Sequence, residues 1–182
     1  MKPISTTRKR KRSISKWPPW PGMITGAAMI VIVAVMIVQS FARNDALRRE
    51  EQQAMAEWDS SWPPLPNAVS GLARPLAVVE AAYVFAGRHG DDVLQYIPCY
   101  CGCEREGHVS NRDCYIRGRT GAGVPQWDPH ATMCGICLDV ARDAKRMYEQ
   151  GMKVAAIRTA IEQQYAPKYG AGTPTSRPPV DR

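Results

Sequence analysis

Three cysteines within five residues constrain this chain more than any other feature of its sequence. Cys99, Cys101 and Cys103 lie in the stretch Pro-Cys-Tyr-Cys-Gly-Cys that begins at residue 98. In an extended backbone alternate side chains share one face, so neighbouring thiols of the three would lie about 6.6 Å apart along the strand. Gly102 permits a bend that brings Cys101 and Cys103 onto one atom. Thiols placed in this way are ligands of a thiophilic metal or halves of disulfides.

The partners of these thiols must come from further along the chain, because a Cys-x-Cys pair that closes on itself makes a small strained ring. Three more cysteines follow, at Cys114, Cys134 and Cys137. An even number of cysteines is typical of structural disulfides in an oxidising compartment. The crowding of the first three instead favours a soft cation. Both interpretations stay open on these residues.

The net charge of +7 belongs to one terminal segment. Residues 1–42 hold seven Lys and Arg and no acidic residue, which accounts for the whole excess. The rest of the chain is formally neutral, so its charge gives no sign of nucleic-acid binding.

The segment after this tail is long and apolar enough to span a membrane. Sixteen residues from Met23 to Val38 carry no charge. Residues 20–41 give about 33 Å of helix, against a bilayer core of about 30 Å. Trp17 and Trp20 stand where an interfacial aromatic belt is expected. The basic residues predict that residues 1–19 are cytoplasmic, which puts everything after residue 41 outside the cytoplasm.

A cleaved signal peptide is the alternative, because Ser40-Phe41-Ala42 fits a small-x-small cleavage site. The length of the apolar core exceeds that of an ordinary signal peptide and favours a retained anchor. Either way the cysteines lie in an oxidising compartment.

Beyond the apolar segment the chain predicts a stalk, a linker and one folded domain. Residues 42–73 begin with charged helix formers and end in a stretch whose three prolines break any helix. The domain is expected over residues 74–168, and a disordered tail over residues 169–182. The predicted fold is mainly α: a small cysteine-stapled helical domain with a long irregular loop, preceded by a single transmembrane helix.

Apolar periodicity predicts three helices in this domain. The first covers about residues 75–88. The second begins near Cys134, with Thr132 as its N-cap, and the third repeats the pattern from Val154 to Tyr165. Between the first and second helices, residues 99–131 carry four cysteines and five glycines with little periodicity. A stretch this long without regular structure needs something to hold it in place, and the cysteines can do so.

The pair Cys134-Gly-Ile-Cys137 opens the second of these helices. A thiolate at a helix N-terminus is stabilised by unpaired amides and the helix dipole. At this spacing both sulfurs lie on one face and can share a metal, so the pair suits redox chemistry and ligation equally. Two histidines flank the thiol pairs, His108 and His130, and we take His108 as a candidate ligand.

Several of these motifs together resemble the PCYCGC-motif family of bacterial lipoproteins. They are IPCYCGC, Gly107-His108, Cys114, WDPH at 127–130 and CGIC before a helix, and the resemblance covers about residues 80–165. It implies an exported, membrane-attached protein of no settled activity. No cysteine follows the apolar run closely, so this chain departs from the lipoprotein signal of many members. A shorter likeness, CxxC before a helix and IRxxIxxxY, is to the helical thiol–reductase subunit of cytochrome c maturation.

We therefore expect an anchored extracytoplasmic protein that binds a thiophilic metal for storage, delivery or resistance. Cu(I) is the expected ion and Zn(II) the alternative. A thiol–disulfide factor in cytochrome or oxidase assembly, with Cys134 and Cys137 as its redox pair, and a purely structural domain are the other hypotheses. The sequence contains no nucleophile–base pair, phosphate loop or paired-carboxylate site, which argues against an enzyme.

The expected partners are the membrane, a metal ion and a metalloprotein client, with no nucleic acid. One attractive arrangement has a disulfide through Cys114 and a metal on the other thiol pairs, Cys101, Cys103, Cys134 and Cys137. The full set of candidate metal ligands is Cys99, Cys101, Cys103, His108, Cys114, Cys134 and Cys137.

Overall fold

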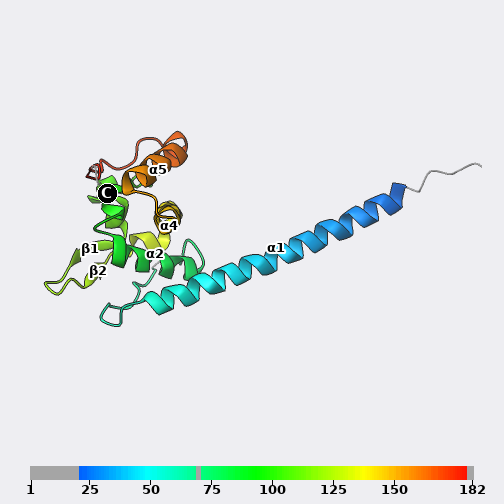
Figure 1. Ribbon diagram of the computed structural model, residues 1–182, viewed down its shortest axis with the longest axis horizontal. Coiled ribbons are helices and arrows are strands. Elements are labelled where there is room, and N and C mark those ends of the chain that lie inside the picture. The colour runs from blue at the N-terminus through cyan, green and yellow to red at the C-terminus, as the bar shows by residue number, and fades with distance from the viewer. Residues whose placement is uncertain (1–20, 69–70, 180–182) are drawn as a thin grey trace, which may run out of the picture. The chain divides into compact units, whose positions relative to one another are not determined.

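The computed structural model describes residues 21–68 and 71–179, with side chains from residue 28 onward. The predicted cytoplasmic tail, Trp17 and Trp20 lie outside the described residues. The first element is helix α1 (Pro21–Glu57), labelled in Figure 1. In the described part of the chain it is the one helix long and apolar enough to cross a membrane. Its apolar side chains, among them Ile30 and Phe41, are exposed, as in a helix that faces lipid.

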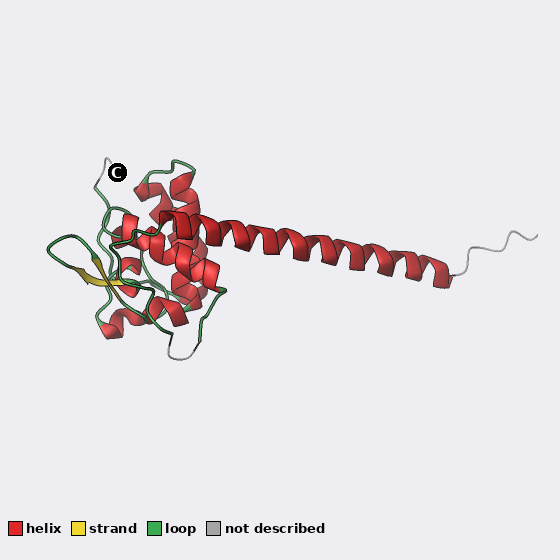
Figure 2. Cartoon of the chain, turned by 90° about the horizontal axis from the view of Figure 1, so that it is seen from below, coloured by secondary structure: helices red, strands yellow, loops and turns green. Residues whose placement is uncertain are grey.

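Three helices form the scaffold of the folded unit, which comprises Arg43–Arg182. Helices α2 (Leu76–His89) and α5 (Val154–Tyr169) both pack against α4 (Gly135–Glu149) (Figure 1). The core between them includes the fully buried residues Val79, Tyr83, Leu138, Val140, Ile157 and Ile161. Figure 2 shows how little strand the chain contains, so the prediction of a mainly α fold with a cysteine cluster is confirmed.

The segment between α2 and α4 contains more regular structure than the irregular loop that we expected. It holds three 3₁₀ turns, η1 (Leu94–Tyr96), η2 (Cys103–Glu106) and η3 (Asn111–Cys114), and the four-residue helix α3 (His130–Met133). It also holds strands β1 (Ile116–Arg119) and β2 (Pro125–Trp127), which pair antiparallel, with Ile116 opposite Trp127. Strands this short carry too few residues for an alternating pattern to be recognised in the sequence.

The proline-rich stretch predicted as a linker packs on the folded unit. Trp58 and Trp62 contact each other edge to face, with ring centroids 5.7 Å apart, and both contact Trp127 of β2. The indole N–H of Trp127 donates to the carbonyl of Pro63 at 3.0 Å. Three tryptophans bury a large apolar area, and this burial fixes a segment whose prolines suggested a free connection.

Part of the tail predicted as disordered is held by buried contacts. Thr173 donates its N–H to the carbonyl of Cys99 and accepts the N–H of Cys99 on its hydroxyl, both at 2.8 Å. Arg158 of α5 is 7% exposed and donates to the carbonyls of Thr175 and Ser176, at 3.0 and 2.6 Å. The low apolar content that suggested disorder is thus offset by hydrogen bonds to distant residues.

Candidate metal centre

The cysteine-rich hexapeptide bends, as its glycine predicted. Gly102 has the left-handed backbone angle φ 80°, which other residues rarely adopt, and Cys103 begins the turn η2 directly after it. The sulfurs of Cys99 and Cys101 lie 3.5 Å apart, not the about 6.6 Å of an extended strand. The bent segment therefore gathers its thiols more closely than an extended strand would.

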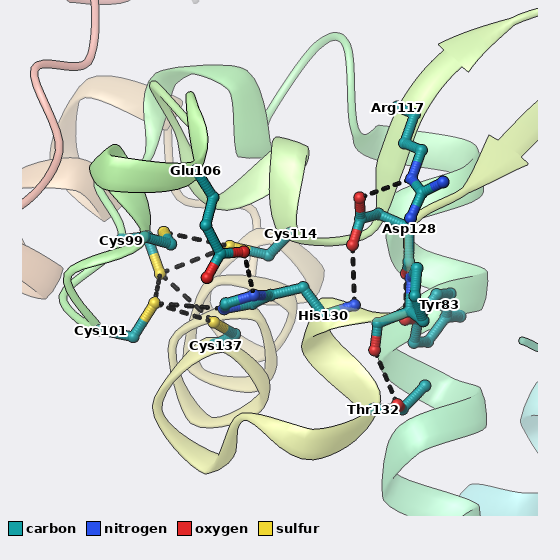
Figure 3. A network of polar contacts seen from close by, with 12 residues as sticks. Tyr83, Cys99, Cys101, Glu106, Cys114, Arg117, Asp128, His130, Thr132 and Cys137 are labelled. Atoms are coloured by element: carbon teal, nitrogen blue, oxygen red, sulfur yellow. Dashed lines mark hydrogen bonds and ion pairs between the residues drawn. The ribbon is translucent and has the colours of Figure 1, made fainter. Parts of the chain in front are cut away.

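Three further cysteines and one histidine reach the same region from other elements, as Figure 3 shows for most of them. Cys114 ends η3, Cys134 is the N-cap of α4, and Cys137 lies in the first turn of that helix. His130 begins α3, and its Nε2 lies 3.5 Å from the sulfur of Cys101. Sequence positions 99 to 137 thus contribute donors to one small volume.

The sulfur–sulfur separations fit a metal ligand set. Cys137 lies 3.5 Å from both Cys99 and Cys101, and Cys114 lies 3.6 Å from Cys99 and 3.7 Å from Cys103. A tetrahedral ion with metal–sulfur bonds of about 2.3 Å has ligand–ligand edges of about 3.8 Å. All six cysteines are free thiols, including Cys114, for which one of the sequence-based arrangements had a disulfide.

The donors form three overlapping groups of four, and within each group all ligand atoms lie within 4.8 Å of one another. The groups are Cys99, Cys101, Cys114 and Cys137; then Cys101, His130, Cys134 and Cys137; then Cys101, Cys103, Cys114 and His130. Cys101 belongs to all three. The four-cysteine set expected from the sequence is divided among these groups, because Cys103 joins Cys114 and His130 and not the pair that opens α4.

Burial differs across the site. Cys99, Cys114 and Cys137 are completely buried and Cys103 nearly so, whereas Cys101 and Cys134 are only partly buried. The buried thiols belong to the apolar core of the unit, and Cys101 and Cys134 pack against it with part of their surface exposed.

His130 is the histidine that joins the donors, and the sequence did not single it out. Its Nδ1 lies 3.0 Å from a carboxylate oxygen of Glu106, and with the proton on Nδ1 the lone pair of Nε2 is directed to the sulfur side (Figure 3). A carboxylate that orients an imidazole in this way is common around metals. His108, our candidate, packs edge to face on His130 and belongs to none of the three ligand groups. Spacing placed both rings beside thiols but gave no sign of their orientation.

The sulfurs of Cys99 and Cys101 each make three contacts within the cluster. Contacts with four neighbouring thiols, that of Cys103 foremost, lower the pKa of Cys101 well below its usual value. Contact with the same sulfur raises the pKa of Cys137, which donates to it at 3.5 Å, and that of Cys114, which donates to Cys99 at 3.6 Å. The contacts of His130 with Cys101 and then Cys134 raise the pKa of its ring to about 11. Contact with Cys101 raises the pKa of Cys99, but contacts with Cys103, Cys114 and Cys137 outweigh it and lower the pKa of Cys99 to about 4. Negative charge in the cluster therefore lies on Cys99 and Cys101.

Side chains from distant elements fix the buried cysteines. The carbonyl of Cys137 accepts hydrogen bonds from the hydroxyl of Tyr115 at 2.9 Å and from the amide of Asn111 at 3.2 Å. The backbone of Cys99 is held on both its polar groups by Thr173. These contacts lock the positions of two ligands before any ion binds, which reduces the ordering that binding requires.

The position of His130 depends on Asp128. One carboxylate oxygen of Asp128 accepts the backbone N–H of His130 at 2.7 Å, and the other pairs with Arg117 of β1 at 2.8 Å (Figure 3). The hydroxyl of Tyr83 on α2 donates to the carbonyl of Asp128 at 2.5 Å. The hairpin and α2 thus set the start of α3 and with it the imidazole.

These features define a class of protein: one long apolar helix joined to a small helical domain whose thiol cluster can hold a metal ion. The model of a family described as "Protein of unknown function with PCYCGC motif" matches residues 29–178, so the chain belongs to that family and the resemblance seen in its sequence is confirmed. The match reaches Thr173, which holds Cys99. No curated protein and no solved structure matches the chain.

Proposed function

We propose that this protein binds a thiophilic metal ion, Cu(I) foremost, in an extracytoplasmic domain that α1 anchors to the membrane. The observation that carries the proposal is the convergence of six thiols and one imidazole into overlapping groups of four. Storage, delivery and resistance are the roles that such a site serves.

The surroundings of the sulfurs support a cation as the missing partner. The hydrogen bonds of the cluster sulfurs run to one another and to His130. Three of the thiols are completely buried, and a buried thiolate without a compensating charge is costly. A soft cation compensates the charge of several thiolates at once.

The ligand types favour Cu(I) over Zn(II). Each group of four offers at least three thiols, and the first offers four. Zinc sites usually place two to four residues between paired cysteines, whereas one residue separates Cys99 from Cys101 and Cys101 from Cys103. Cu(I) accepts two or three sulfur ligands without that loop, and Zn(II) is the alternative ion.

Topology and exposure support a role in metal handling outside the cytoplasm. The basic residues before the apolar segment favour a cytoplasmic N-terminus. Cys101 and Cys134 are partly exposed, which gives a metalloprotein client access to the ligands. An ion can then pass to the client by exchange of one sulfur ligand at a time.

A thiol–disulfide factor is the second candidate, and one observation favours it. Cys134 is partly exposed at the start of α4, while Cys137 in the first turn is completely buried. An accessible thiol at a helix N-terminus next to a buried one suits nucleophilic attack followed by resolution. This candidate needs only these two cysteines.

The test is metal binding by the full chain, reduced and kept in detergent micelles without oxygen. Cu(I) uptake is measured by competition with a chelator of known Cu(I) affinity, and Zn(II) uptake in parallel. We expect the wild type to bind Cu(I) tightly and the double variant Cys101→Ser, Cys137→Ser to lose most of this binding. The reason is that two of the three ligand groups contain both of these thiols, and the third group contains Cys101.

Two histidines provide a matched comparison. His130 contacts Glu106 at 3.0 Å and His89 contacts Asp92 at 3.3 Å, but His89 lies at the end of α2 and outside the ligand groups. We expect His130→Gln to weaken Cu(I) binding by at least about tenfold and His89→Gln to leave it unchanged. Wild-type protein that takes up neither metal yet cycles a Cys134–Cys137 disulfide would overturn the metal proposal in favour of the redox candidate.

A further inference from the structure

The site contains more donors than one ion uses. Cu(I) and Zn(II) accept at most about four protein ligands, and seven donors meet here. The first group of four contains Cys99 and Cys114, and the second contains His130 and Cys134 in their place. A single ion in either group leaves two donors of the other beside it.

The first and second groups overlap in two sulfurs, those of Cys101 and Cys137. These sulfurs lie 3.5 Å apart, with Cys137 donating to Cys101. A thiolate sulfur has lone pairs enough to bind two metal ions at once. Both groups can therefore be filled together, with the two sulfurs as a shared edge.

The third group competes with the second. Both need Nε2 of His130, and an imidazole nitrogen has one lone pair and binds one ion. The third group also draws on Cys103, whose sulfur lies 3.7 Å from that of Cys114. Filling the first and second groups uses six donors and leaves Cys103 outside both.

We propose that the centre holds two Cu(I) ions side by side, bridged by the thiolates of Cys101 and Cys137; this inference rests on the proposed function. Cys99 and Cys114 complete the inner site, and His130 and Cys134 complete the outer one. Each ligand that carries a proton beforehand, whether a thiol or the imidazolium of His130, releases it to solvent when it binds. Two tetrahedral sites that share an edge, with bonds of about 2.3 Å, place their ions about 2.7 Å apart.

The two sites differ in access. The ligands particular to the inner site, Cys99 and Cys114, are completely buried. Those particular to the outer site, His130 and Cys134, are partly exposed. The outer ion is therefore the one that exchanges with a client, and the inner ion stays and holds the bridging thiolates in place.

The test counts ions on the full chain. Reduced protein in detergent micelles is titrated with Cu(I) without oxygen and examined by native mass spectrometry, and X-ray absorption spectroscopy looks for scattering of one copper by another. We expect two ions per chain and a short copper–copper path. One ion per chain would overturn the two-ion centre and leave the proposed function standing, whereas no bound copper would overturn both.

Two cysteine variants test the assignment of ligands. Cys134 is the N-cap of α4, where serine is a favoured residue, so Cys134→Ser is expected to fold. Combined with His130→Gln, it leaves the outer site only the two bridging sulfurs, so this double variant should bind one ion and lose the copper–copper path. The control Cys103→Ser removes a thiol from outside both sites and should keep two ions. Two ions on the double variant, or one on Cys103→Ser with an unchanged circular dichroism spectrum, would contradict the assignment.

Discussion

The helical scaffold and the cysteine segment of the same folded unit are held by different kinds of interaction. Helix α4 completely buries Leu138, Val140 and Ala141, and burial of a large apolar side chain contributes about 1.5–3 kcal/mol. The segment from Cys99 to Cys114 is held instead by sulfur contacts and by hydrogen bonds to distant residues.

This difference has a physical consequence. Apolar packing does not depend on the redox state of the surroundings or on the supply of metal. Contacts between thiols depend on both, because a sulfur can be oxidised, protonated or bound to an ion. The scaffold and the cysteine segment should therefore respond to different solution conditions, although both contribute to one core.

Metal removal should produce the largest separation between the two regions. A ligand present at a thousand times its Kd stabilises the state that binds it by about 4 kcal/mol. We expect a chelator to increase amide hydrogen exchange strongly over residues 99–116 and much less within α2 and α5. The double variant Cys101→Ser, Cys137→Ser is the control and should show no effect of the chelator. Equal changes in all the helices and the segment would mean that the regions form one cooperative unit.

A core substitution in α4 should instead weaken both regions together. Leu138 is completely buried, and Leu138→Ala should lower the free energy of unfolding by about 3 kcal/mol, since the same helix carries Cys137. Urea denaturation followed by tryptophan fluorescence measures this. Leu76→Ala, on α2 at a site 47% exposed, is the matched control and should change stability by less than about 0.5 kcal/mol. A loss confined to the scaffold, with Cu(I) affinity unchanged, would refute the coupling.

The smallest effect should come from the hydroxyl that holds Cys99. Thr173→Val removes the acceptor of the buried N–H of Cys99. It should lower the free energy of unfolding by about 1–2 kcal/mol, first in the local unfolding of the cysteine segment. Hydrogen exchange at Cys99 and its neighbours measures it. Thr159→Val is the control, because the exposed Thr159 bonds only within its own helix, to the carbonyl of Ala155. Exchange that is unchanged in Thr173→Val would show that this contact does not order the segment.

The helical scaffold was predictable because each helix follows from the apolar spacing of residues that are near one another in the sequence. Apolar spacing over residues 75–88 and from Val154 to Tyr165 predicted helices that the structure has as Leu76–His89 and Val154–Tyr169. The start of α4 was also placed correctly near Cys134, but Cys134 is itself the N-cap. The hydroxyl of Thr132, predicted as the cap, donates instead to the carbonyl of Pro129, directly before α3. Local sequence preference thus determines where the helices form, and the neighbouring turns determine where they begin and end.

The site was predictable in its residue types and not in its grouping. The crowding of the cysteines and the bend at Gly102 follow from adjacent residues. The choice of His130 over His108 depends on Glu106 and Asp128, which lie 24 and 2 residues from His130 and show no pattern in the sequence. Single hydrogen bonds such as these leave no periodic pattern in the sequence, so the hairpin and the ordered tail escaped prediction for the same reason.

The hydrogen bond between Cys99 and Thr173 can form only late in the synthesis of the chain. Thr173 follows Cys99 by 74 residues, which a ribosome adds in about 4–15 s at about 5–20 residues per second. During that interval Cys99, Cys101 and Cys103 have been made and the residue that fixes the first of them has not. Disulfides form within seconds to hours, so an incorrect bond has time to appear. Whether a new chain matures thus depends on how well its earliest thiols are kept reduced until Thr173 arrives.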